Sequence, residues 1–205
     1  MNSTTQYIAF LRGINVGGHK KVPMAELRKR MEALGFVQVI TILNSGNVIF
    51  NASEREEGSL EAGIAKKLKQ SFGFPIPVLI RKAETVAHLL EANPFQEIEV
   101  TKDIRLYISF LKEEPSNLPT LPWANEDGSY RILQVKGRAV CSVLNLSATQ
   151  TTEGMKVLEQ LFGKNITTRN WNTLLRISKK LGWHTLHWIV AFRRLIWFFS
   201  AISHY

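Results

Sequence analysis

Residues 7–12, Tyr-Ile-Ala-Phe-Leu-Arg, and residues 107–112, Tyr-Ile-Ser-Phe-Leu-Lys, are nearly the same apolar string one hundred positions apart. Each string has the length of a strand and the composition of one. Two shorter matches follow in the same order along the chain: Ser45-Gly46-Asn47 with Lys136-Gly137-Arg138, and Ile80-Arg81 with Thr168-Arg169. Three ordered matches favour an internal duplication over a coincidence between short apolar strings.

The first copy predicts six elements in the order strand, helix, strand, strand, helix, strand. The helix that starts near Pro23 has apolar residues at Leu27, Met31 and Leu34, and Gly35 suits its end. A Ser45-Gly46 turn joins the next two strands. The expected strands are residues 7–12, 37–43, 47–50 and 77–81, and a second helix spans residues 57–71. A short helix ended by Asn93-Pro94 follows.

This order is the split arrangement of ferredoxin-like domains. The sequence therefore predicts an α+β fold with two tandem ferredoxin-like (βαββαβ) subdomains related by internal duplication, plus a C-terminal helical tail. The predicted boundaries are residues 1–93, 94–182 and 183–205. In the second unit, three prolines make residues 113–127 a loop with one turn at most, and the helix at residues 153–162 is shorter than its counterpart.

The net charge of +9 comes mainly from the C-terminal end. No Asp or Glu follows Glu159, whereas seven Lys and Arg lie from Lys164 onward. This distribution weakens the interpretation of the whole protein as a nucleic-acid binder, although nucleic acid is not excluded as a partner. Cys141 is the one cysteine, so an internal disulfide is excluded, and neither a zinc site nor a cofactor is predicted. Without a secretory signal at the N-terminus, the expected compartment is the cytoplasm.

The tail at residues 183–205 is rich in Trp and Phe and carries Arg193-Arg194 at its centre. Each central Arg would cost about 2.5–3.5 kcal/mol in a membrane span, so a span is disfavoured. The alternatives are a helix that packs on the domain, an extension with no role in the fold, and an amphipathic helix at a membrane surface. The first two are favoured over the third.

The first candidate site is the glycine-rich loop after the first strand. Its glycines allow backbone N–H groups to form an anion-binding nest, and the helix that follows adds a positive dipole end. The predicted ligand-binding residues of this loop are Arg12, Gly13, Asn15, Gly17, Gly18 and Lys20. His19 and Lys20 stand where a P-loop needs Lys and Ser or Thr, so nucleotide hydrolysis is disfavoured. A solvated, sharply turning loop explains the same pattern equally well.

The second candidate is the segment that contains Arg169, Asn170 and Asn172. Asn170 or Thr168 suits the cap of a helix, and this role explains part of the pattern. An arginine beside two asparagines and Trp171 also suits a carboxylate or phosphate, which a bidentate Arg anchors well.

Three functions follow from these candidates. The first is a binding module in which the two segments converge on one small anionic ligand between the subdomains. The second is an enzyme that acts on an anionic small molecule, with His19 as general acid or base and Arg169 as anchor. The third is nucleic-acid binding. The sequence predicts neither the oligomeric state nor the identity of the ligand.

Three separated motifs complete the sequence evidence: FLRGINVGG at residues 10–18, NSGNVIF at residues 44–50 and TTRNWNT at residues 167–173. In this order they resemble the signatures of the bacterial domain-of-unknown-function family numbered 1697, over about residues 7–180. The resemblance implies an α+β fold with two related subdomains and implies no activity. After Lys180 the chain departs from the family pattern, because the aromatic tail follows the helix of the third motif.

Overall fold

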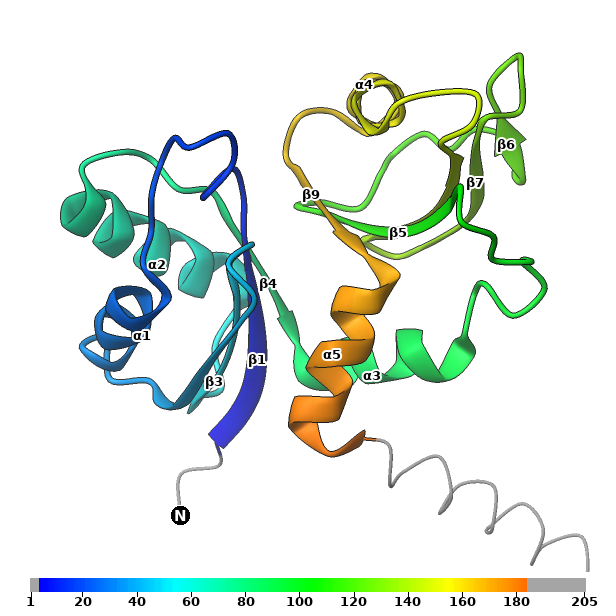
Figure 1. The fold of residues 1–205 in the computed structure, drawn as a ribbon. Helices are drawn as coiled ribbons and strands as arrows, with labels where there is room; N and C mark the ends of the chain where they lie inside the picture. The colour runs from blue at the N-terminus through cyan, green and yellow to red at the C-terminus, as the bar shows by residue number, and fades with distance from the viewer. Residues whose placement is uncertain (1–3, 184–205) are drawn as a thin grey trace, which may run out of the picture.

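The computed structural model describes residues 4–183 and contains two antiparallel sheets and five helices in this part of the chain (Figure 1). The first sheet is formed by β1 (Thr4–Leu11), β2 (Val37–Ile42), β3 (Asn47–Ser53) and β4 (Val78–Lys82). The second sheet is formed by β5 (Ile104–Leu111), β6 (Trp123–Ala124), β7 (Tyr130–Lys136), β8 (Ala139–Asn145) and β9 (Ile166–Asn170). The predicted mixed α+β class is confirmed.

The helices lie where the sequence places apolar residues at helical spacing. They are α1 (Met24–Glu32), α2 (Glu57–Phe72), α3 (Ala83–Ala92), α4 (Thr151–Phe162) and α5 (Trp171–Leu181). Gly73 ends α2 and Gly182 ends α5, both in the left-handed region that glycine adopts without strain. The role predicted for the tail falls on residues 184–205, which lie outside the described residues.

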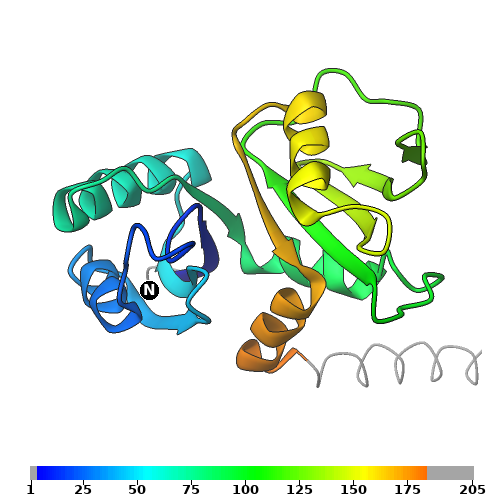
Figure 2. The same cartoon turned by 45° about the horizontal axis from the view of Figure 1, so that its top comes forward.

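The strand order is β2-β3-β1-β4 in the first sheet and β6-β7-β8-β5-β9 in the second. In each sheet the strand with the repeated apolar string lies between two antiparallel neighbours: β1 pairs with β3 and β4, and β5 pairs with β8 and β9. Figures 1 and 2 show α1 and α2 on the outer face of the first sheet and α4 on the outer face of the second. The helices α3 and α5 lie together on the inner side.

The second sheet departs from the predicted order because no helix lies between β5 and β7 in the described chain. Pro115, Pro119 and Pro122 remove backbone donors from this stretch, as the sequence predicts. The connection instead forms the short edge strand β6, and Leu121 and Trp123 pack against the outer core of the second sheet.

Both faces of β1 and β5 are buried, which explains their nearly continuous apolar sequence. On β1, Tyr7, Ala9 and Leu11 face the outer core under α1 and α2, whereas Ile8 and Phe10 face the inner core. The inner core is shared by both sheets and by α3 and α5. The two halves of the chain are therefore joined by a common hydrophobic layer in addition to the linker.

Phe10 and Phe110, the matching aromatic residues of the two repeated strings, meet at the centre of this layer. Their ring centroids lie 4.3 Å apart with an interplanar angle of 20°, and both side chains are buried. This stacked pair brings β1 and β5 into contact near the C-terminal ends of both strands. We call the region where these two strand ends meet the seam.

Replacing either ring at the seam should destabilise both sheets. We expect Phe10→Ala and Phe110→Ala each to lower the free energy of unfolding by about 3–5 kcal/mol, because each leaves a cavity at a buried contact. The effects should not add in the double variant, because the first replacement already removes the shared contact. Urea unfolding measures both quantities.

Phe50→Ala is the control, because Phe50 stacks on Tyr7 in the outer core of the first sheet. Its effect should add to that of Phe110→Ala. If Phe10→Ala and Phe110→Ala were as additive as this control pair, the stacked rings would not couple the sheets.

Candidate functional site

The glycine-rich loop leaves β1 at Arg12 and closes on itself through the side chain of Asn15. The Asn15 amide donates to the Val22 carbonyl at 3.0 Å and to the Asn44 carbonyl at 2.8 Å, and its oxygen accepts from the Val22 N–H at 2.8 Å. Positive φ angles occur at Gly13, Asn15, Gly17, Gly18 and Lys20. Turn geometry therefore accounts for the glycines of the loop. His19 and Lys20 are exposed at its tip.

Arg169 lies on β9, and only 8% of its surface is exposed. Its Nε donates to the Asn47 side-chain oxygen at 2.6 Å, and its Nη2 donates to the Leu11 carbonyl at 2.7 Å. Its remaining hydrogen bonds go to oxygen atoms of Ser45, Gly46, Thr167 and Thr168. The three sequence motifs thus meet at a single buried guanidinium.

Every nitrogen of the Arg169 guanidinium donates to the protein itself, so a ligand would have to replace one of these hydrogen bonds. Burial lowers the pKa of Arg169 to about 10, which leaves the side chain protonated at neutral pH. Gly46 allows the close approach of the segments around it, because a Cβ there would lie 2.7 Å from the Ile14 side chain and 2.8 Å from the Leu11 Cβ.

Asn170 and Asn172 have different surroundings. The Asn170 side chain accepts from the Asn172 N–H at 2.9 Å and caps α5, which confirms the predicted cap. Asn172 is exposed. On β9, Ile166 pairs with Leu111, whereas Asn170 pairs with Tyr107 further back along β5. Arg169 thus donates to the end of β1, whereas its neighbour Asn170 caps α5 and Asn172 is exposed on that helix.

Arg81 on β4 makes the reciprocal contact from the first half to the second. It donates to the carbonyl of Leu111 and, at 3.5 Å, to that of Arg138. Its guanidinium lies 5.6 Å from the Phe110 ring centroid, and that of Arg169 lies 5.5 Å from the Phe10 ring centroid. Each half therefore supplies one buried arginine to the strand end of the other half.

Arg81 differs from Arg169 in having acidic neighbours on α2. Its Nη1 lies 3.6 Å from Glu57 and 3.9 Å from Glu61. Burial, followed by the charge of Arg138, lowers the pKa of Arg81 to about 10. Burial also raises the pKa of the Glu61 carboxyl, although the hydrogen bond from the Ile80 N–H opposes this shift.

Two further arginines cross the seam nearer to the surface. Arg12 donates to the carbonyl of Lys164 and, at 2.6 Å, to Glu159 on α4. Arg138 donates to Glu57 on α2. The two Arg12 bonds hold the beginning of the glycine-rich loop against the segment before β9, which contains Lys164.

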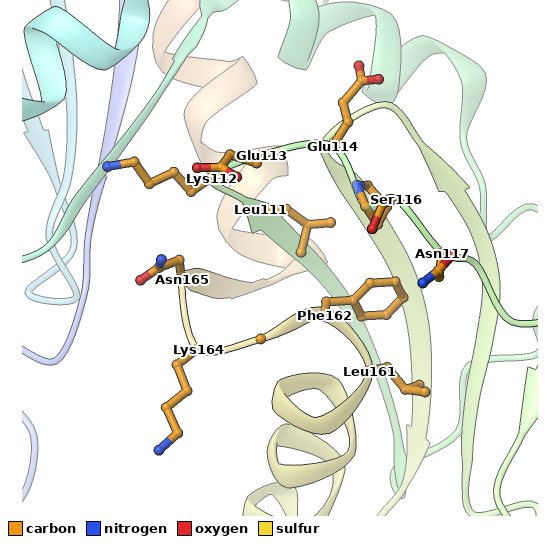
Figure 3. Close-up of a pocket in the computed structure, with 12 residues that line it drawn as sticks. Leu111, Lys112, Glu113, Glu114, Ser116, Asn117, Leu161, Phe162, Lys164 and Asn165 are labelled. Carbon is orange, nitrogen blue, oxygen red and sulfur yellow. The ribbon is translucent and has the colours of Figure 1, made fainter.

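A cavity of about 310 Å³ opens beside this contact (Figure 3). It lies between the loop after β5, residues 111–117, and the segment from α4 to β9, residues 161–165. Figure 3 shows Lys112, Lys164 and Asn165 on one side of the cavity and Phe162 with Asn117 on the other. Within residues 4–183, neither Lys112 nor Lys164 forms an ion pair, although the charge of Lys112 acts to lower the pKa of the buried Glu61 carboxyl against the larger raising effect of burial.

The sequence motifs did not identify this cavity. Lys112 matches Arg12 in the repeat, but neither Lys164 nor Asn165 belongs to a recognisable motif. The sequence contains only an indirect sign of the cavity. No helix is predicted after the first strand of the second unit, so the residues that follow Lys112 must form a loop.

Among residues 4–183, no group of three or more His, Cys, Asp or Glu side chains is arranged to hold a metal ion. In the same range, no helix combines the length and the apolar character that crossing a membrane requires.

Comparison with known proteins places the chain in a family. The family model described as "Protein of unknown function (DUF1697)" matches residues 4–140. The chain belongs to this family. The first two sequence motifs lie inside the matched range, and the motif around Arg169 follows it. The predicted family resemblance is thus confirmed.

A solved structure shares the DUF1697 fold of this chain. It is described as that of a conserved bacterial protein from Streptococcus pneumoniae and is 24% identical, with a TM-score of 0.61. The similarity covers 86% of this chain and 98% of the other. A comparison with curated proteins gave no match.

Removing the forked donor of Arg169 should destabilise this DUF1697 protein. We expect Arg169→Lys and Arg169→Met each to lower the free energy of unfolding by about 3 kcal/mol or more, because buried carbonyl groups and the Asn47 side chain lose their donors. Arg176→Lys, at an exposed position of α5, should change it by less than about 0.5 kcal/mol. Urea unfolding of the three variants would refute the structural role if Arg169→Lys matched the control.

Cys141 should be unreactive in the folded protein. The side chain is fully buried, and burial raises the pKa of its thiol to about 11. At pH 8 only about one thiol in a thousand would be ionised. We expect a thiol-specific chromogenic reagent to react with the single cysteine only after denaturation, and rapid reaction of the native protein would contradict the described packing of β8.

Proposed function

We propose that the protein binds a small anionic ligand in the cavity between residues 111–117 and residues 161–165. The observation that carries this proposal is that Lys112 and Lys164 line one cavity and have no ion-pair partner among the described residues. Exposed ammonium groups on long, flexible side chains can turn toward a phosphate or carboxylate at the cavity mouth. The Asn165 side chain, on the same side of the cavity, offers hydrogen bonds to such a group (Figure 3).

The surrounding charges support an anion at this position. Arg12 and Arg138 reach the cavity backbone, because they donate to the carbonyls of Lys164 and Lys112. Two acidic residues, Glu113 and Glu114, also line the cavity. Figure 3 shows the Glu114 side chain directed away from the other lining residues, so Glu113 is the main competitor for the lysines.

The glycine-rich loop is proposed as a second wall of the site. Its first residue, Arg12, contacts the segment that lines the cavity, and Gly13, Gly17, Gly18 and Lys20 are exposed on the loop that follows. We assign the anchoring of the anion to Lys112 and Lys164 in place of Arg169, because the N–H groups of Arg169 already donate hydrogen bonds to the protein. A cytoplasmic location remains our expectation, consistent with a single free cysteine.

We also propose that the two sheets descend from one duplicated ferredoxin-like unit. The corresponding strand orders support this origin, with β2-β3-β1-β4 in the first sheet and β7-β8-β5-β9 in the second. The reciprocal contacts support it too, because Arg81 binds the Leu111 carbonyl and Arg169 binds the Leu11 carbonyl. Under this proposal the second unit has lost its first helix.

Binding of an anion should stabilise the full chain against heat. At a hundredfold excess over its Kd, a ligand adds about 2.7 kcal/mol, or about 5–10 °C in Tm for a chain of this size. We expect inorganic phosphate or a small phosphorylated compound to raise Tm, and Lys112→Ala/Lys164→Ala to abolish the increase. Differential scanning fluorimetry at low ionic strength measures it.

The control is Lys179→Ala/Lys180→Ala, which removes the same charge from exposed positions at the end of α5. This variant should keep the full increase in Tm, and Glu113→Gln should enlarge it by removing a competing carboxylate. Equal loss in the two double-lysine variants would indicate a general charge effect and would refute the site.

A further inference from the structure

The two ends of the cavity differ in chemistry, and this difference restricts the kind of anion that fits. Lys112, Lys164 and Asn165 lie at one end of the cavity, where the two lysine side chains extend in different directions and would have to turn to bind one anion (Figure 3). At the other end, Figure 3 shows the ring of Phe162 beside the amide of Asn117. A ligand that uses both ends must carry an anionic group at one end and a flat, partly polar group at the other.

The size of the cavity adds a second restriction. At about 310 Å³ it lies at the lower limit of small-molecule pockets, which span about 300–1,000 Å³. One ring system with one phosphate suits this volume, whereas a dinucleotide cofactor exceeds it. Phe162 is half-buried, because it packs on the outer core of the second sheet. An aromatic ring anchored in this way offers a stable surface on which a planar group can stack.

We propose that the ligand is a nucleoside monophosphate. The phosphate binds at Lys112 and Lys164, the base stacks on Phe162, and the polar side chains of Ser116 and Asn117 accept and donate hydrogen bonds at the edge of the base. This assignment rests on the proposed function, because it requires the anion site at the two lysines. To the anion of the proposed function, this assignment adds an aromatic base as the second half of the ligand.

Calorimetric titration of the full chain separates the two halves of the ligand. The probes are inorganic phosphate, ribose 5-phosphate, adenosine and adenosine 5′-monophosphate. We expect the monophosphate to bind at least about tenfold more tightly than ribose 5-phosphate, the gain typical of one base stacked on an aromatic side chain. Lys112→Ala/Lys164→Ala should weaken both phosphorylated probes, and Phe162→Leu should weaken the nucleotide alone.

Phe162→Leu keeps an apolar side chain at a half-buried position, and its urea midpoint shows whether the fold is intact. If ribose 5-phosphate and the nucleotide bind equally well, the base assignment fails and the anion site stands. If no phosphorylated probe binds, the proposed function fails with it. Tighter binding of a 5′-phosphorylated dinucleotide than of the mononucleotide would overturn the assignment in favour of a nucleic-acid end.

Discussion

The structure depends on two buried arginines that each satisfy the strand end of the opposite half. Arg169 has no carboxylate within ion-pair distance among the described residues, so its charge is stabilised by oxygen atoms of the protein backbone and of neutral side chains. A buried cation of this kind is tolerated only if all its acceptors stay in place. The ends of β1 and β9 and the turn between β2 and β3 must therefore keep their relative positions, which explains why separate sequence motifs meet there.

Most of the fold could be predicted from the sequence, because strands, helices and turns follow local patterns. The apolar string at residues 7–11, the turn at Gly46 and the three prolines after Lys112 each predict a feature that the structure contains. The burial of Arg169 could not be predicted, since its neighbours Thr168 and Asn170 are polar and suggest an exposed segment. The one sequence feature that pointed to a structural role for Arg169 was Arg81, which stands at the matching place in the first half. A residue that anchors a ligand has no reason to occur in both halves.

Two other arginines at the seam, Arg12 and Arg138, bear on the proposed anion site. Arg138 and Arg12 pair with Glu57 and Glu159, whereas Lys112 and Lys164 form no ion pair among the described residues. The charge of Lys112 still acts on the buried Glu61 carboxyl, whose pKa it helps to lower against the larger raising effect of burial. A cation that is fixed by the fold contributes to the local potential without moving, and a cation on a flexible side chain can then complete the coordination of a ligand. Under the proposed function, an anion in the cavity beside Lys112 would be stabilised in part by charges whose first role is structural.

The proposed duplication also accounts for the position of the cavity beside the second sheet. In the first half, the segment after β1 buries Ile14 and Val22 against the outer core and leads into α1. In the second half, prolines prevent a helix after β5, and the segment forms an open loop that leaves space next to Phe162. If the two halves are copies of one unit, the residues at the seam must stay alike because the halves contact each other there, whereas their surfaces can differ. One copy could then lose a helix and open a cavity on its surface, while the arginines that hold the two halves together stay in place.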